Sequence, residues 1–427
     1  MGKNAEKLVY LAVFSFTFFC AQQILYMPAM NQKQLAAATF GGVGRLDSTL
    51  YVVPVSITTI LFGFAADDAD RRLLYLAASV LILGFTQLAV PHAWSYGIAA
   101  LLRVLTGAAE GAIQPICVTV ITSLFVKHTS KAMGVYNWAI YLAYSSAIVL
   151  NKITQDKFWW SYYSLGCLCF LCFVSILILE LSRRKKSAKS SAYSKGEKVN
   201  PQAPALEELK KNLLEILNIA KRNETLLMLI GALCRHTAGF TFGYNQVDYF
   251  KNERKFEEAE SYLPFAPIVA GVSGSFLGGL LTDAIQKNER LAGPRAGLLV
   301  LFLSQFVGGP LMAVVLTVDS PYCFYLLYLA YMIIEMWFGI FLVCYSSFFP
   351  SRIQGQAIGY TIFILRLVCQ NSAAFISLLR QVLSFHSAML IMVPGLQLIS
   401  AILFLTSFCI LPRPSPTNPD KKRRTSF

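Results

Sequence analysis

Charged side chains are scarce in this sequence: Asp, Glu, Lys and Arg make up 14% of its 427 residues, where average soluble chains carry about a quarter. Because 56% of the residues are also hydrophobic, the composition argues against an ordinary soluble domain and indicates a polytopic membrane protein. Histidine is rarer still, with four residues, and the ten cysteines lie in apolar runs without a metal-ligand spacing to any histidine. We therefore expect no metal and interpret the thiols as small buried hydrophobic groups.

Enzyme signatures are missing too. The chain has no P-loop, no HExxH zinc motif and no GxSxG elbow, so we expect neither catalysis, nor a cofactor, nor ATP-driven transport. The formal net charge of +14 would suggest a nucleic-acid partner for a soluble protein, but the basic residues here fall mostly in short loops and tails. That distribution is typical of membrane topology, and it predicts no nucleic-acid partner.

Long apolar runs dominate the chain. A membrane span needs about 20 apolar residues, and about twelve such runs are present, centred near Thr17, Thr58, Leu81, Gly107, Tyr141, Cys169, Ala238, Gly274, Gln305, Met332, Arg366 and Ala401. The loops that follow even-numbered runs are basic, which places both termini in the cytoplasm. The sequence therefore predicts an all-α polytopic membrane protein with about twelve transmembrane helices in two pseudo-symmetric six-helix bundles.

One polar segment separates the two sets of six runs. We expect a first bundle over 1–182, a cytoplasmic linker over 183–224, a second bundle over 225–412 and a basic cytoplasmic tail over 413–427. The linker contains an amphipathic helix with apolar residues on one stripe, namely Leu206, Leu209, Leu213, Leu214, Ile216 and Leu217. We expect this helix to lie under the bundle; the alternative is a helix that binds lipid at the interface.

A weak internal repeat supports the two-fold arrangement, which is that of secondary transporters. After the second and the eighth run, a glycine stands four residues before an aspartate and a basic stretch follows. Glycine allows helices to approach closely, and the aspartate can accept hydrogen bonds from the N-terminal amides of a neighbouring helix and pair with arginine. The residues of this expected gating motif are Gly63, Asp67, Arg71 and Arg72 in the first half, and Gly279 and Asp283 in the second.

Six ionisable residues lie inside apolar runs, and each is a candidate functional residue because a charge at bilayer depth costs about 2.5–3.5 kcal/mol on insertion scales. They are Arg103, Glu110, Arg235, His236, Glu335 and Arg366. Counting residues from the span ends places the three arginines and Glu335 near one plane facing a central cavity. Glu110 would lie about 10 Å further towards the cytoplasm, on the face of Arg103.

Two interpretations of these charges stay open. Arginine and glutamate side chains can simply pair and hold the bundle together. Alternatively, three arginines facing two glutamates leave a positive surplus that favours an anionic group, which arginine binds through a bidentate fork. Tyr244 and Asn245, in an aromatic stretch beside Arg235, are candidates to line the substrate site, although such a stretch also fits packing or lipid contact.

The loop over residues 63–72 resembles the Gly-x-x-x-Asp-Arg-x-Gly-Arg-Arg signature of the major facilitator superfamily, with Asp68 and Asp70 standing where that signature has Arg and Gly. The stretches RVLTGAAEGAIQP (103–115) and IEMW (334–337) are similar to the fourth and tenth helices of the Spinster-like family of that superfamily. The acidic–basic pair that many Spinster-like proteins have in the first span is replaced by Gln22 and Gln23.

The resemblance implies a secondary transporter that moves a lysosphingolipid or lysophospholipid by alternating access, with protons as a possible coupling ion. Glu110 is the candidate proton carrier, because a buried carboxylate beside an arginine changes its proton affinity with its surroundings, and His236 is the second candidate. The alternatives are a transporter of a small polar anion, such as a sugar phosphate or carboxylate, and a transport-inactive scaffold. We expect a monomer in the plasma membrane or in a lysosomal or endosomal membrane.

Overall fold

The computed structural model describes residues 3–30, 43–154, 157, 159–191, 206–370 and 372–412, and every regular element within them is helical. The first half contains α1 (Lys3–Met30), α3 (Val43–Asp67), α4 (Arg72–Ala89), α5 (Tyr96–Glu110), α6 (Ile113–Leu124), α7 (Thr129–Ile153) and α8 (Trp159–Ser191). Helix α9 (Leu206–Ala220) follows the linker. The expectation of an all-α polytopic fold is confirmed.

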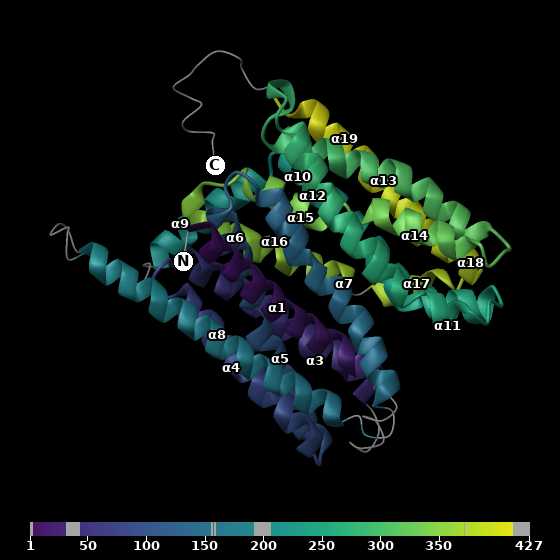
Figure 1. Ribbon diagram of the computed structural model, residues 1–427. Helices are drawn as coiled ribbons and strands as arrows, with labels where there is room; N and C mark the ends of the chain where they lie inside the picture. Colours follow the sequence, from purple (N-terminus) through teal and green to yellow (C-terminus); the bar gives the residue numbers. More distant parts are fainter. Residues whose placement is uncertain are drawn as a thin grey trace.

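The second half begins with α10 (Asn223–Asp248). It continues with α11 (Ala259–Tyr262), η3 (Pro267–Gly271), α12 (Val272–Ile285), α13 (Pro294–Thr317), α14 (Cys323–Ile334), α15 (Phe338–Ser346), η5 (Ser351–Ile353), α16 (Gln354–Cys369), α17 (Ser372–Leu379), α18 (Phe385–Leu390) and α19 (Leu396–Ile410). Figure 1 shows the two halves side by side, the first running from purple to teal and the second from teal to yellow.

Ten helices or helix pairs in the described residues are long and apolar enough to cross a membrane. The two other expected spans, the fifth and the eleventh, are helical as well, as α7 and as α16 with α17. These two are also the helices that join the halves: α7 packs along α12, and α16 packs along α3. A span that faces the other half needs less apolar surface than one that faces lipid, which explains its lower hydropathy.

Two spans are interrupted at a glutamate. In the fourth span α5 ends at Glu110 and α6 begins at Ile113. Pro115 has no amide hydrogen to donate to the carbonyl of Gly111, so the break has a local cause. In the tenth span α14 ends at Ile334 and α15 begins at Phe338, with Glu335 directly after the first piece. Each break leaves backbone groups that need other partners inside the membrane.

The hydrophobic core runs through both halves. One cluster of buried side chains includes Phe14 and Ile116 of the first half together with Phe341 of the second. The halves therefore share this cluster, while a second cluster, which includes Phe250 and Phe324, lies within the second half.

All ten cysteines are free thiols and seven of them are buried. The expectation that all ten are buried was wrong for Cys167 and Cys409, which are exposed, and for Cys234, which is partly buried.

Helix α9 lies at the end of the bundle where α1 begins (Figure 1). Its buried face consists of Asn212, Ile216 and Ile219, whereas Leu214 and Leu217 are 59% and 43% exposed. Of the predicted stripe, Ile216 is buried and Leu213 partly buried, whereas Leu214 and Leu217 face outwards, so the stripe coincides only in part with the packing face. The buried residues follow the spacing i, i+4, i+7 from Asn212. The side chains of Leu206 and Leu209 lie outside the described residues, as do the expected tail over 413–427 and most of the linker.

The expected boundaries of the four units stay a prediction. Helix α8 runs on to Ser191, past the expected end of the first bundle at residue 182. Its extension past the span is polar, which is consistent with a helix that leaves the membrane before the linker.

Candidate gating and substrate sites

The first gating contact joins α3 to the start of α16. Asp67 ends α3, and its Oδ1 and Oδ2 accept the backbone N–H groups of Gly355 and Gln356 at 2.8 and 3.1 Å. These are amides of the first turn of α16, so the carboxylate also lies at the positive end of the helix dipole. The predicted role of Asp67, as acceptor for the amides of a neighbouring helix, is confirmed. The sequence also predicted an ion pair between Asp67 and an arginine, and the described contacts include no such pair.

Glycine makes that contact possible. A methyl group at Gly63 would lie 2.9 Å from the carbonyl oxygen of Gly355 and 3.3 Å from Cα of Gly359. Such a methyl group would meet backbone, which cannot move aside as a flexible side chain can. The two helices therefore cross with their backbones in contact, as the glycine in the motif predicted.

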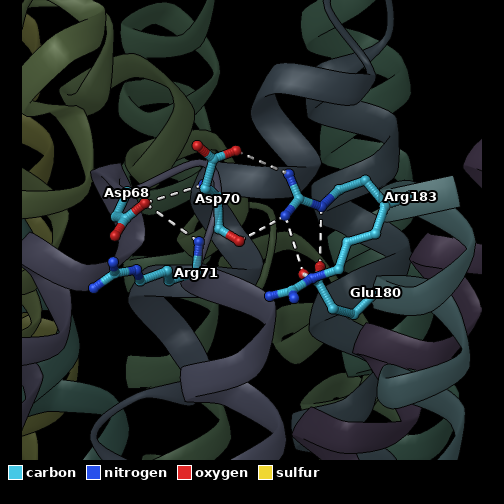
Figure 2. Close-up of polar contacts among 6 residues, drawn as sticks. Asp68, Asp70, Arg71, Glu180 and Arg183 are labelled. Atoms are coloured by element: carbon cyan, nitrogen blue, oxygen red, sulfur yellow. Dashed lines mark hydrogen bonds and ion pairs between the residues drawn. The ribbon is translucent and has the colours of Figure 1, made fainter. Parts of the chain in front are cut away.

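The two aspartates that depart from the superfamily signature bind within their own loop and to α8 (Figure 2). Asp68 accepts the backbone N–H groups of Asp70 and Arg71 at 3.0 and 3.2 Å. Arg183 donates to the carbonyl oxygen of Asp70 at 2.6 Å, lies 3.6 Å from its carboxylate and also pairs with Glu180 at 2.9 Å. The loop is thus held by an arginine from the sixth span, and the backbone of Arg71 rather than its guanidinium takes part.

The second gating contact joins α12 to the start of α7. A methyl group at Gly279 would lie 2.6 Å from the carbonyl oxygen of Ser130. Asp283 Oδ2 is 3.9 Å from Nδ1 of His128, the residue before α7. The sequence repeat therefore corresponds to a spatial one: in each half, a Gly-x-x-x-Asp helix end meets the N-terminus of a helix of the other half. By the positive-inside rule these two contacts lie on the cytoplasmic side, where they hold the two halves together in this structure.

Glu110 forms the first of two buried polar centres. Its Oε1 is 3.1 Å from Nη2 of Arg366 in the other half, and its Oε2 accepts the hydroxyl of Tyr51. The same Arg366 nitrogen donates to Oε1 of Gln114 at 3.2 Å. The guanidinium of Arg103 lies over the Tyr51 ring, 5.2 Å from its centroid. Both Glu110 and Arg366 are buried, at 1% and 6% exposure.

Gly107 allows this centre to form. A methyl group there would lie 2.5 Å from the carbonyl oxygen of Tyr51, so α5 and α3 meet backbone to backbone beside the centre. The prediction that Gly107 permits a close approach of another helix is confirmed.

Glu335 forms the second centre. Its Oε1 accepts from Nη2 of Arg235 at 2.9 Å, and its Oε2 accepts the hydroxyl of Tyr141 in the first half at 2.7 Å. The carbonyl oxygen of Ile334, freed by the helix break, accepts from Arg235 Nη2 at 3.2 Å and from Gln305 Nε2 at 3.1 Å. The broken helix thus supplies a backbone acceptor as well as a carboxylate to the same arginine.

All the ionisable residues of the two centres were singled out from the sequence, but one of them was grouped wrongly. Arg366 was expected in the plane of Arg103, Arg235 and Glu335, yet it binds Glu110, the carboxylate that was expected about two turns below that plane. Counting residues along a span gives the depth of a side chain in the membrane only to about ±4 residues. It does not give the direction in which the side chain points around the helix axis. The ionisable groups therefore form two separate centres, each of which bridges the halves.

Three further predicted site residues lie on α10, the helix that carries Arg235. His236 sits among aromatic rings, with centroid distances of 4.9 Å to Phe240, 5.3 Å to Trp337 and 5.7 Å to Phe338. Tyr244 is 46% exposed, and its ring lies 5.6 Å from that of Phe240. Asn245 donates to the carbonyl oxygen of Thr241 in its own helix at 2.8 Å.

These arrangements differ in what they can do. Tyr244 presents an accessible aromatic surface, whereas the amide of Asn245 already has a local partner. Across the part of the chain that the structure describes, the ring nitrogens of His236 have no hydrogen-bond partner that would relay a proton. The role of His236 as a proton carrier and that of Asn245 in binding stay predictions.

The sequence profile of the Major Facilitator Superfamily matches residues 9–369, which is most of the chain. The chain belongs to the Major Facilitator Superfamily. None of the curated proteins compared with the sequence matches it. The match shows a multi-pass membrane protein of a transporter family, and with it a secondary transporter in general, but it extends to no subfamily. The broken fourth and tenth spans and the paired Gly-x-x-x-Asp contacts are therefore parts of a transporter.

Four residues of the two centres in this transporter were not predicted from the sequence, namely Tyr51, Gln114, Tyr141 and Gln305. None carries a charge, and all four lie in apolar runs where a search for ionisable residues passes over them. A signal for Tyr141 was present: it is the thirteenth residue of α7, and Arg366 is the thirteenth residue of α16. Superposing the two halves as repeats would have pointed to it.

Proposed function

We propose that this transporter moves an amphiphilic organic anion or zwitterion of the lysolipid class by alternating access, with a proton as the coupling ion. The observation that carries the proposal is the incomplete hydrogen bonding of the Arg366 guanidinium. Its Nη2 binds Glu110 and Gln114, while its Nη1 is buried and has no hydrogen-bond partner among the described residues. A buried N–H group without a partner costs about 1–3 kcal/mol, so an anion that supplies the missing acceptor is favoured.

The proton enters the proposal through Glu110. Protonation neutralises the carboxylate, which weakens its hold on Nη2 of Arg366, and both terminal nitrogens then become available to one anionic group. Arginine binds phosphate and carboxylate through such a bidentate fork. Proton and anion would then load together, which is the stoichiometry of symport.

An amphiphilic substrate is favoured over a small polar anion by the surroundings of the second centre. The Arg235–Glu335 pair lies beside Trp337, whose ring centroid is 5.0 Å from the Arg235 guanidinium. Phe240 and the half-exposed Tyr244 extend this aromatic surface along α10. A charged group next to an extended aromatic wall suits a molecule that has a polar head and an apolar chain.

The test is uptake into liposomes that contain the purified protein, measured for a panel of lysolipids and small organic anions with and without a pH gradient. We expect uptake of lysolipids to rise with acyl-chain length and with the gradient. Uptake of sugar phosphates or carboxylates alone would support the small-anion alternative instead, and no uptake of any compound would support the scaffold.

Two variants make the proton role specific. Glu110→Gln mimics the protonated carboxyl, so uptake should continue but lose its pH dependence, with folding intact. Glu180→Gln is the matched control, because Glu180 is equally buried and paired with arginine, in a different part of the bundle. Unchanged pH dependence in Glu110→Gln would remove Glu110 from the mechanism.

A further inference from the structure

Helix α9 and the segment before α16 enclose an open hollow of about 830 Å³ at the cytoplasmic end of the bundle. Three basic residues line it, namely Lys210, Lys211 and Arg222, together with Leu214, Ile219, Phe348 and Pro350. Glu215 and Asn218 complete the lining. The hollow is separate from both buried centres and belongs to no element of the gating contacts.

The hollow carries a surplus of positive charge. Lys210, Lys211 and Arg222 are exposed and form no ion pair in the described part of the chain. Glu215 is the one carboxylate in the lining, and it is already paired with Arg352, which also donates to Asn212 at 2.9 Å. Among the side chains that the structure describes around the hollow, the three cations therefore outweigh a carboxylate whose charge is neutralised by its own partner.

Apolar surface lies next to these cations. Leu214 is 59% exposed and Leu217 is 43% exposed, on the side of α9 that does not pack on the bundle. Exposed leucines beside lysine and arginine on one helix are typical of a helix at the membrane interface. A small soluble anion would leave that apolar surface exposed, whereas the acyl chains of a lipid would cover it.

We propose that this hollow binds the phosphate headgroup of an anionic phospholipid from the cytoplasmic leaflet, with the acyl chains along Leu214 and Leu217. The lysines and Arg222 bind the phosphate, and each basic residue near an anionic surface strengthens binding about five-fold. The site adjoins the gate, because Arg352 holds α9 three residues before Gly355, whose amide binds Asp67.

The experiment measures binding of dioctanoyl phosphatidic acid to the full-length purified protein in detergent, by native mass spectrometry. The triple variant Lys210→Gln, Lys211→Gln, Arg222→Gln should bind this lipid roughly 100-fold more weakly. Lys127→Gln, Lys287→Gln, Arg290→Gln is the matched control, since it removes three exposed cations from other loops at the same end of the bundle, and its binding should equal that of the wild type. Equal melting temperatures of the two variants exclude misfolding as the cause.

Two further measurements distinguish this lipid site from a soluble-phosphate site and from the proposed substrate site. Glycerol phosphate, which has the headgroup without acyl chains, should bind far more weakly than the lipid; equal binding would show a site for a soluble phosphate and overturn the lipid assignment. Arg366→Gln removes the proposed substrate site and should leave phosphatidic acid binding unchanged. Wild-type affinity in the first triple variant would refute the proposal, whatever the transport assays show.

Discussion

Replacing Asp67 by asparagine tests the cytoplasmic contact between the two halves. The carboxylate binds two amides of the first turn of α16, at 2.8 and 3.1 Å, while α3 and α16 touch through Gly63 and Gly355. Asparagine has nearly the same shape, so it preserves the glycine crossing and removes only the charge and one acceptor. The variant should therefore shift the transporter away from the cytoplasm-closed arrangement without unfolding it.

The size of the shift follows from those contacts. Hydrogen bonds to a charged group contribute about 1.5–3 kcal/mol each, and a charge at a helix N-terminus adds about 0.3–1 kcal/mol. Asparagine keeps one neutral acceptor and turns an NH₂ group towards the other amide, so we expect a loss of about 2–4 kcal/mol. That corresponds to a change of roughly 30- to 1000-fold in the ratio of closed to open molecules.

The assay is the distance between spin labels at Lys127 and Lys287, which are exposed and belong to opposite halves at the cytoplasmic end. The labels are attached to cysteines that replace these two residues, in a background that lacks Cys167 and Cys409, the two exposed thiols among the described residues. In Asp67→Asn the distance distribution should gain a long component that the wild type lacks.

The neighbouring carboxylate supplies the control. Asp68 accepts amides of its own loop only, so Asp68→Asn removes the same charge one residue away and should leave the label distances unchanged. If both variants gave the wild-type distribution, the bonds from Asp67 to α16 would not hold the halves together, and the reasoning would fail.

Three further substitutions have defined outcomes. Gly63→Val places side-chain atoms against the backbone of α16 and should destabilise the closed state by about 1–3 kcal/mol, seen in the same label distances, while Gly97→Val, with open space around it, should not. Tyr141→Phe removes the hydroxyl that donates to Glu335 across the halves. The closed state should lose about 1.5–3 kcal/mol, so the label distances should lengthen less than in Asp67→Asn. An unchanged distance distribution would show that this hydrogen bond does not hold the halves together. Arg366→Lys keeps a cation for Glu110 but not the fork, so KM for the transported lysolipid should rise roughly ten-fold or more with pH dependence retained; an unchanged KM would argue against bidentate binding.

Much of the fold could be predicted from the sequence, because hydrophobic length and loop charge report directly on the membrane. The ten apolar spans and the contact of Asp67 with helix amides follow from local patterns. The break after Glu110 was not predicted, although Pro115 gives it a local cause. The break after Ile334 had no such sign, since neither glycine nor proline interrupts residues 334–338. It is stabilised by Arg235 and Gln305, which are distant in sequence.

The packing face of α9 shows the same limit. The leucine pattern marks an apolar stripe, but a stripe can face the bundle or the membrane, and sequence alone does not distinguish the two. Arg352 decides the matter by binding Asn212 and Glu215, which turns the face with Ile216 and Ile219 inward. The exposed leucines then become the basis of the lipid site rather than part of the core.

The two buried centres show how a symmetric scaffold can carry asymmetric chemistry. The fourth and tenth spans each break at a glutamate, and each glutamate binds the thirteenth residue of a helix from the opposite half. In one centre that residue is Arg366, a cation, and in the other it is Tyr141, a neutral phenol. A change of charge on Glu110 therefore alters an ion pair between the halves, whereas the cross-half link of Glu335 is a hydrogen bond to a neutral group, and its ion pair with Arg235 lies within one half. In the mechanism that we propose, the repeated geometry lets the halves rock as a pair, and the arginine that stands where the other half has tyrosine places proton and anion sensitivity on the Glu110 side.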